Sequence, residues 1–172
     1  KIILTGDGRV AKGSLEFFKH TNIKQVSAED YLNNSHNEAV FCNLKTHDYV
    51  ERYDNKLFSL KDFILNPDQY KSKIKKYLLK TNMLIASHYW DPLSPKLFSK
   101  NEMKEFKNLK IIGDITCDIN GSIPTTIRST SIKEPYYSID INSMQESNFD
   151  DNALSVMAVD NLPSELPKES SE

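Results

Sequence analysis

The chain of 172 residues carries a formal net charge of −2, and its length suits one domain with its own core. A charge so close to zero provides no basic field, and no apolar run reaches the length of a membrane span, so nucleic acid and membrane are excluded as expected partners. Cys42 and Cys117 are too few for a disulfide framework and lack the spacing of a metal site, so we expect two small buried thiols in a reducing compartment, the cytoplasm (or the mitochondrion in a eukaryote).

The first residues combine a short apolar run, a glycine turn and a helical pattern. Residues 2–4 predict a buried parallel strand, and a Gly-x-Gly-x-x-Ala turn begins directly after it at Gly6. Strand, turn and helix in this order form the dinucleotide-binding fingerprint, in which phosphates meet the free N–H groups of the helix. Gly6 permits the tight turn, and Gly8 lets a pyrophosphate approach the backbone. The residues predicted to contact an NAD or NADP cofactor here are Gly6, Gly8, Arg9 and Val10.

Apolar runs and helical patterns then alternate along the chain. Further strands are expected at residues 23–26, 38–42, 83–86, 110–113, 136–141 and 153–159. Asn66 with Pro67 predicts the start of one helix, and the pair Ser99 and Glu102 predicts a capping box at another. Strands separated by helices imply right-handed crossovers. We therefore expect a Rossmann-type, doubly wound parallel sheet with three α/β/α layers over residues 1–160.

Ligands of open α/β sheets bind at the carboxyl ends of the strands, so polar residues in the loops after each strand are candidate contacts. Ser27 follows the second strand, where it could hold a ribose hydroxyl or a 2′-phosphate, which leaves NAD and NADP open. Residues 43–60 are predicted to be a functional loop or a lid, whose His47 is either a cofactor contact or a surface histidine. His88 and Tyr89 follow the fourth strand, where a nicotinamide ribose would pass.

Acidic loops follow the fifth and the last strand. Asp114 and Asp118 lie in one glycine-flanked loop, which is costly unless they are solvated or paired. At the mouth of a nucleotide cleft, such a carboxylate can orient a substrate amine or the nicotinamide. Asp160 and Asn161 end the last strand, and they could also be simple turn formers.

The most specific stretches of the sequence are GDITCDINGS at residues 113–122 and DNLPSELP at residues 160–167. Together with the glycine turn and the run His88-Tyr89-Trp90, they resemble the lysine-ketoglutarate reductase and saccharopine dehydrogenase enzymes of the alanine dehydrogenase/transhydrogenase superfamily. The resemblance covers nearly the whole chain. It implies NAD(P)-dependent hydride transfer at a secondary amine, in which lysine, 2-oxoglutarate and NAD(P)H give saccharopine.

The same resemblance implies site residues and a domain arrangement. Asp118 matches the acidic residue that faces the nicotinamide and the substrate. The loop that touches the nicotinamide side of the cleft is Asp160, Asn161 and Leu162. Residues 1–160 would be inserted into a split substrate domain, to which residues 161–172 lead back. Because the family's lysine and histidine acid/base pair belongs to an N-terminal part that this chain lacks, we expect a fragment that binds cofactor but does not turn over alone.

Two departures from the family pattern keep alternatives open. Asn120 stands where acidic residues are common, and residues 124–126 replace bulkier ones. An alanine dehydrogenase-like amino-acid dehydrogenase therefore stays an alternative. So does a non-catalytic nucleotide-sensing domain, although it would not need Asp118 and Asp160 at separate strand ends. A homo-oligomer is left open as well.

Overall fold

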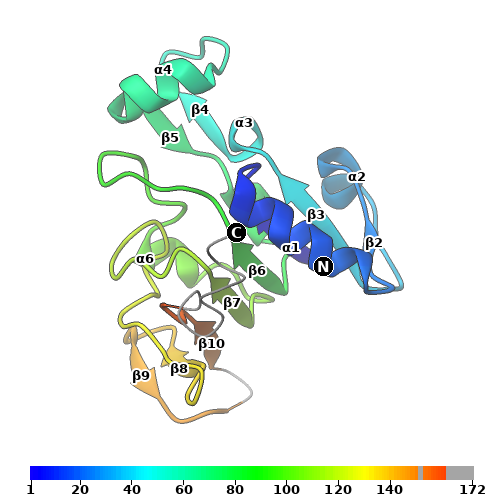
Figure 1. Cartoon of the computed structure of the whole chain (residues 1–172), viewed down its shortest axis with the longest axis vertical. Helices are drawn as coiled ribbons and strands as arrows, with labels where there is room; N and C mark the ends of the chain where they lie inside the picture. Colours follow the sequence, from blue (N-terminus) through cyan, green and yellow to red (C-terminus); the bar gives the residue numbers. More distant parts are fainter. Residues whose placement is uncertain (151–152, 162–172) are drawn as a thin grey trace.

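The computed structural model describes residues 1–150 and 153–161. Within them, a central sheet of eight strands is flanked by helices (Figure 1). In spatial order its strands are β2 (Lys24–Gln25), β3 (Val40–Leu44), β1 (Ile2–Thr5), β6 (Met83–Ala86), β7 (Ile111–Asp114), β10 (Leu154–Met157), β8 (Tyr136–Asp140) and β9 (Gln145–Ser147). The α-helices of the described residues are α1 (Arg9–Lys19), α2 (Ala28–Asn33), α3 (Thr46–Tyr49), α4 (Leu60–Leu65), α5 (Lys75–Leu78) and α6 (Lys100–Met103). Neighbouring strands from β2 to β10 run parallel, which confirms the predicted Rossmann-type α/β class.

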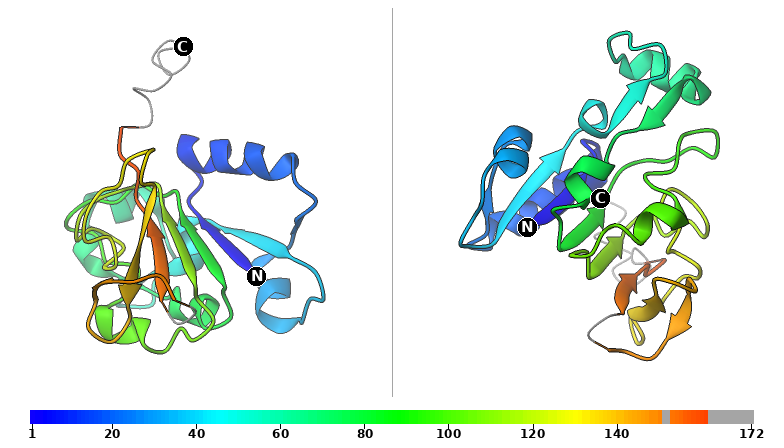
Figure 2. Two further views of the ribbon diagram at one scale, coloured as in Figure 1. Left: turned by 90° about the horizontal axis from the view of Figure 1, so that it is seen from below. Right: turned by 180° about the vertical axis from the view of Figure 1, so that it is seen from behind.

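The centre of the sheet is buried on both faces, which explains why its strands are nearly continuous apolar runs. Ile3 of β1 pairs with Cys42 of β3 and with Leu84 of β6, and all three side chains are buried. The same face packs in one core with residues of α2, α5 and α6. On the opposite face, Phe18 of α1 stacks on Phe41 of β3 with ring centroids 4.1 Å apart. Figure 2 shows α1 and α2 on opposite sides of the sheet.

One edge of the sheet differs from the wholly parallel arrangement expected from the sequence. Strand β8 runs antiparallel to both β10 and β9. A short turn joins β8 to β9, and the Asp140 carboxylate at its start accepts hydrogen bonds from the N–H groups of Asn142 and Ser143. A parallel pair would need a crossover connection of about a dozen residues, which this turn does not provide.

A smaller unit extends from the end of β3 (Figure 1). Its strands β4 (Val50–Arg52) and β5 (Tyr70–Ser72) pair antiparallel, and α4 lies between them in the chain. Residues 43–60, expected to be a loop or a lid, therefore contain α3 and β4. The unit stands at the same end of the sheet as the glycine turn.

The prediction of a single helix after Asn66 is wrong. A 3-10 turn at Pro67–Gln69 leads directly into β5, and α5 begins later, at Lys75. Tyr70 explains the difference, because its ring packs against Phe63 at 5.1 Å as part of β5. Pairing with β4 and this packing outweigh the local helical pattern.

The capping box predicted at Ser99 is confirmed. Ser99 Oγ accepts a hydrogen bond of 3.2 Å from the N–H of Glu102, whose carboxylate accepts one of 2.8 Å from the N–H of Ser99. Across residues 1–150 and 153–161, every helix is too short or too polar to cross a bilayer. Residues 162–172, predicted to lead to a substrate domain, lie outside the described residues.

Candidate functional site

A pocket of about 430 Å³ opens at the carboxyl ends of β1, β6 and β7. Parallel strands end at the same edge of a sheet, so the loops that follow these three strands meet there. Its lining residues are Gly8, Arg9, Val10, Ser87, His88, Tyr89, Trp90, Thr116 and Asp118. The residues predicted from the sequence that line it are Gly8, Arg9, Val10, His88, Tyr89 and Asp118. The glycine turn and the acidic loop, more than a hundred residues apart in the chain, thus share one pocket.

The two glycines of the turn play different parts in the structure. Gly6 has a φ of 105°, and a Cβ there would lie 2.7 Å from the carbonyl oxygen of Ser87. The turn itself is held by two hydrogen bonds of 2.9 Å, from the Gly6 N–H to the Leu44 carbonyl and from Asn43 Nδ2 to the Gly6 carbonyl. Gly8 has ordinary backbone angles, and a Cβ there would meet no described atom within 4 Å. The fold therefore needs glycine at position 6, whereas at position 8 glycine leaves open space in front of the backbone.

Helix α1 begins at this open space. Gly8 is its N-cap residue, and within the described residues no side chain caps the helix and no acid stands in its first turn. The first N–H groups of an α-helix have no partners inside the helix, and the helix dipole favours negative charge beside them. This end of α1 can therefore accept an anionic group.

His88 is the most deeply buried titratable side chain of the pocket. It is 8% exposed, and its Nδ1 shares a hydrogen bond of 2.8 Å with Thr5 Oγ1. Its Nε2 has no hydrogen-bond partner among the described residues. Buried polar atoms normally have partners, so the imidazole has the capacity to bind a further polar group. Burial lowers the pKa of His88 to about 4, which keeps the ring neutral near pH 7.

This low pKa predicts acid sensitivity. An unfolded histidine has a pKa of about 6.5, so between pH 6.5 and pH 4 the unfolded chain binds a proton that the folded chain does not. The free energy of unfolding should fall by about 2 kcal/mol between pH 7.5 and pH 5 because of His88 alone. Urea denaturation of the wild type and of His88→Gln at both pH values measures this contribution as the difference between the two pH dependences. Equal pH dependences would contradict it.

Asp118 stands on a tightly wound loop after β7. Cys117 and Asn120, on either side of it, have φ angles of 48° and 56° in the left-handed region. The N–H of Gly121 donates to the Asp118 carbonyl at 2.8 Å, and a Cβ at Gly121 would lie 2.5 Å from the Asp118 Cβ. Position 121 has no room for a side chain, so glycine there permits this tight turn. The turn in turn holds the exposed Asp118 carboxylate at the pocket.

Asp114, the other acid of this loop, has a different environment. It is fully buried, and its carboxylate accepts hydrogen bonds of 2.6 Å from the hydroxyl groups of Thr116 and Thr126. Burial raises the pKa of Asp114, and these hydrogen bonds oppose the rise. Asp114 therefore shapes the loop, while Asp118 faces the pocket. Thr116, which lines the pocket, was not predicted, and its position between the two acids is the signal that could have found it.

The end of β10 lies near this loop. Burial raises the pKa of the half-buried Cys117 thiol, and the negative charges of Asp114, Asp118 and Asp160 raise it further. Cys117 is thus less buried than expected, while Cys42 is buried as expected. Asp160 is exposed, Asn161 has a φ of 57°, and neither lines the 430 Å³ pocket. Leu162, predicted to contact the cofactor, lies outside the described residues.

Ser27 lies at the outer edge of the sheet. Strand β3 separates β2, which precedes Ser27, from β1. The Ser27 Oγ accepts a hydrogen bond of 3.1 Å from the N–H of Asp30 and so caps α2. The structure does not bring Ser27 together with the lining residues of the pocket.

A smaller pocket of about 170 Å³ lies on the other side of the glycine turn, at the ends of β1 and β3. Its lining residues are Gly6, Asp7, Gly8, Thr46, Leu60, Phe63, Ile64, His88 and Tyr89. Gly8, His88 and Tyr89 line both pockets. The two pockets therefore adjoin across the glycine turn.

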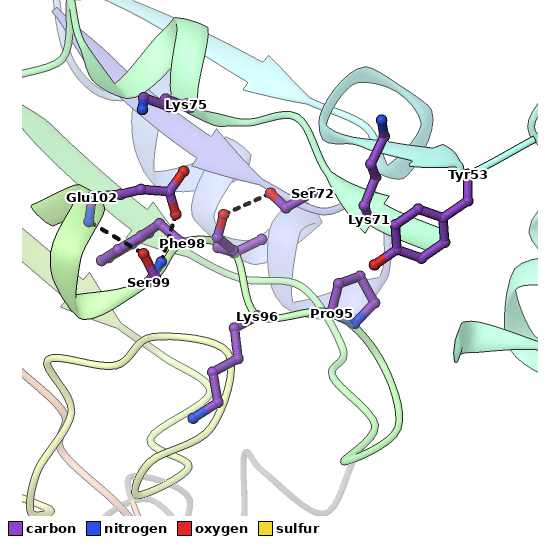
Figure 3. A pocket seen from close by; sticks show the side chains of 10 residues that line it. Tyr53, Lys71, Ser72, Lys75, Pro95, Lys96, Phe98, Ser99 and Glu102 are labelled. Atoms are coloured by element: carbon purple, nitrogen blue, oxygen red, sulfur yellow. Dashed lines mark hydrogen bonds between the residues drawn. The ribbon is translucent and has the colours of Figure 1, made fainter. Parts of the chain in front are cut away.

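A further pocket of about 300 Å³ lies between β5 and the segment that leads to α6 (Figure 3). Most of its polar side chains are bonded within the chain. Ser72 Oγ donates to the Leu97 carbonyl at 2.6 Å, and Lys96 Nζ donates to the Asn120 carbonyl at 2.7 Å. Lys75 pairs with Glu105 at 2.7 Å. Since these groups already have partners, the two pockets beside the glycine turn are the stronger candidate site.

Comparison with known proteins yields related sequences. The chain is 31% identical to an alpha-aminoadipic semialdehyde synthase of Arabidopsis thaliana over 195 aligned positions, which cover 99% of the chain and 18% of that protein. It is 24% identical to the mitochondrial alpha-aminoadipic semialdehyde synthases of Bos taurus and Rattus norvegicus, with 99% of the chain and 21% of each relative covered. No protein-family model matches the chain. The chain therefore spans about a fifth of the length of these relatives, and through nearly all of its residues it is related to the alpha-aminoadipic semialdehyde synthases.

Proposed function

We propose that this chain is the nucleotide-binding part of an NAD(P)-dependent oxidoreductase that acts on a secondary amine of the saccharopine type in lysine metabolism. The observation that carries the proposal is the single pocket shared by Gly8, His88 and Asp118. The relationship to alpha-aminoadipic semialdehyde synthases supports lysine chemistry. The resemblance of residues 113–122 and 160–167 to saccharopine dehydrogenases supports the reaction class.

The residues of the pocket fit a dinucleotide. The open space at Gly8 and the uncapped N-terminus of α1 would hold the diphosphate, with Arg9 as a cationic neighbour. The unpartnered Nε2 of His88 offers the cofactor a polar contact. When bound, NADH or NADPH supplies the hydride that reduces the imine of lysine and 2-oxoglutarate to the secondary amine.

The chain's own residues bind and orient. The exposed Asp118 carboxylate, which lines the pocket, would attract and orient the cationic amine of the substrate beside the nicotinamide. Asp160, Asn161 and Leu162 are proposed to contact the nicotinamide side of the cleft. The proposed substrates are lysine with 2-oxoglutarate, or saccharopine in reverse. An acid/base pair from a separate substrate domain would complete the site, so this chain alone should bind cofactor without turnover.

Trp90 provides the test, because it lines the pocket and its Nε1 is fixed by a hydrogen bond of 3.3 Å to the Ser94 carbonyl. Titration of the chain with NADH and with NADPH is expected to quench Trp90 fluorescence in a saturable manner, with a Kd that also ranks the two cofactors. Calorimetric titration of the same wild-type chain, which does not depend on light absorption, serves as the control for inner-filter effects. Absence of saturable binding of both cofactors would refute the proposal.

A further inference from the structure

The order of the strands in the sheet decides which loop stands beside the glycine turn. In a dinucleotide-binding domain, the residue that reads the adenosine ribose follows the strand next to β1. Here that neighbour is β3, since Leu44 pairs with Thr5 and accepts a hydrogen bond from Gly6. Thr46 therefore stands beside the turn. Ser27 is one strand farther away, which adds about 5 Å.

The 170 Å³ pocket occupies this position. It adjoins the 430 Å³ pocket at Gly8, so a molecule that crosses the glycine turn with its diphosphate extends one end into each. Asp118 lines the larger pocket, which the proposed function gives to the nicotinamide. The smaller pocket then remains for the opposite end of the molecule.

The chemistry of the smaller pocket matches a nucleoside. Leu60 and Ile64, one helical turn apart on α4, form an apolar wall although they are 50% and 68% exposed. Asp7 and Thr46 add a carboxylate and a hydroxyl group, which suit the hydroxyls of a sugar. Apolar walls with a few polar groups are typical of small-molecule sites, and a bound base would cover apolar surface that otherwise faces water.

Helix α4, which carries this apolar wall, is held in place by contacts with β4 and β5. Asp62 of α4 pairs with Arg52 of β4 and accepts a hydrogen bond of 2.7 Å from the Tyr70 hydroxyl. Phe63 packs edge to face on the Tyr70 ring at 5.1 Å. Strands β4 and β5 thus anchor α4, whose Leu60 and Ile64 share the pocket with the glycine turn. Figure 1 shows α4, β4 and β5 grouped as one unit.

From this arrangement we infer that the pocket of Thr46, Leu60 and Ile64 binds the adenosine end of the cofactor, with α4 as the wall against the adenine. The inference rests on the proposed dinucleotide function. It assigns the β4–α4–β5 unit a part in binding, and it moves the ribose contact from the loop after β2 to the loop after β3.

Ile64 and Leu65 provide a matched pair for the test. Both are apolar, adjacent in α4 and 68% exposed, but Ile64 lines the pocket and Leu65 does not. Ile64→Ser is expected to weaken binding of NADH and of 5′-AMP by about tenfold, the loss of one apolar contact with the base. Nicotinamide mononucleotide should bind this variant as it binds the wild type. Leu65→Ser should leave all three affinities unchanged, as measured by calorimetry.

The outcomes separate this inference from the proposed function. If Ile64→Ser binds 5′-AMP as tightly as the wild type, or weakens nicotinamide mononucleotide equally, the adenosine lies elsewhere and the inference fails, while NADH binding by the wild type still supports the function. If the wild type binds neither NADH nor NADPH, both fail. Circular dichroism and a thermal melt of both serine variants establish that α4 remains folded.

Discussion

Gly8→Ala is expected to reduce the affinity for NADH and NADPH by about tenfold to a hundredfold, since overpacking by a methyl group costs about 1–3 kcal/mol. The added Cβ meets no described atom of the chain within 4 Å, so the methyl group would project into the space that we assign to the diphosphate. The stability cost should stay below about 1 kcal/mol, the usual penalty for alanine at an N-cap position. Calorimetric titration and urea denaturation measure the two effects separately.

Two other glycines complete this experiment. Gly13→Ala also adds a Cβ that meets no described atom within 4 Å, but inside α1, so it should stabilise the chain by about 0.5–1 kcal/mol and leave binding unchanged. Gly6→Ala should instead destabilise the fold, because its φ of 105° and the Ser87 carbonyl 2.7 Å away both exclude a side chain. A Gly8→Ala variant that binds both cofactors normally would show that the diphosphate does not lie at this turn.

Asp118→Asn is expected to lower kcat for saccharopine formation by about a hundredfold in the enzyme that contains this chain, the scale on which misplacement of a substrate slows a reaction. The amide keeps the size of the side chain but removes the charge that attracts the substrate amine. Cofactor affinity should change less than threefold, because Asp118 is not among the residues that we propose to hold the diphosphate. The decrease of NAD(P)H absorbance at saturating lysine and 2-oxoglutarate measures kcat.

The control for this variant is Asp68→Asn, which neutralises an exposed carboxylate in the 3-10 turn before β5, outside the residues that line either pocket beside the glycine turn. It should leave kcat unchanged. An Asp118→Asn enzyme with wild-type kcat would show that Asp118 does not orient the substrate. It would leave the cofactor proposal intact, since Gly8→Ala tests that separately.

Part of the site could be predicted because the sequence patterns that indicate it lie within a few neighbouring residues. The glycine turn depends on residues within a few positions of Gly6, and the apolar run of β1 shows that it is buried on both faces. The same holds for the capping box at Ser99, which needs a partner three residues away. Such features are specified by neighbours in the chain, so one sequence is enough to find them.

Other predictions failed or fell short because distant residues decide them. The helical spacing after Asn66 predicted a helix through Tyr70, but pairing with β4 and packing on Phe63 made a strand there. The ribose contact at Ser27 stays a prediction, but the sheet places β3 between β2 and β1, so Ser27 does not line the pocket. A local pattern carries no information about which strand becomes its neighbour.

The sequence by itself determined the class of fold, the buried strands and the residue types available for chemistry, because hydrophobic periodicity and turn geometry are properties of short segments. The tertiary structure alone decided that Asp118 meets Gly8, that Asp114 is buried instead of available, and that α4 stands beside the glycine turn. These relations depend on strand order and on packing between segments far apart in the chain, where burial free energy summed over the whole core selects one arrangement.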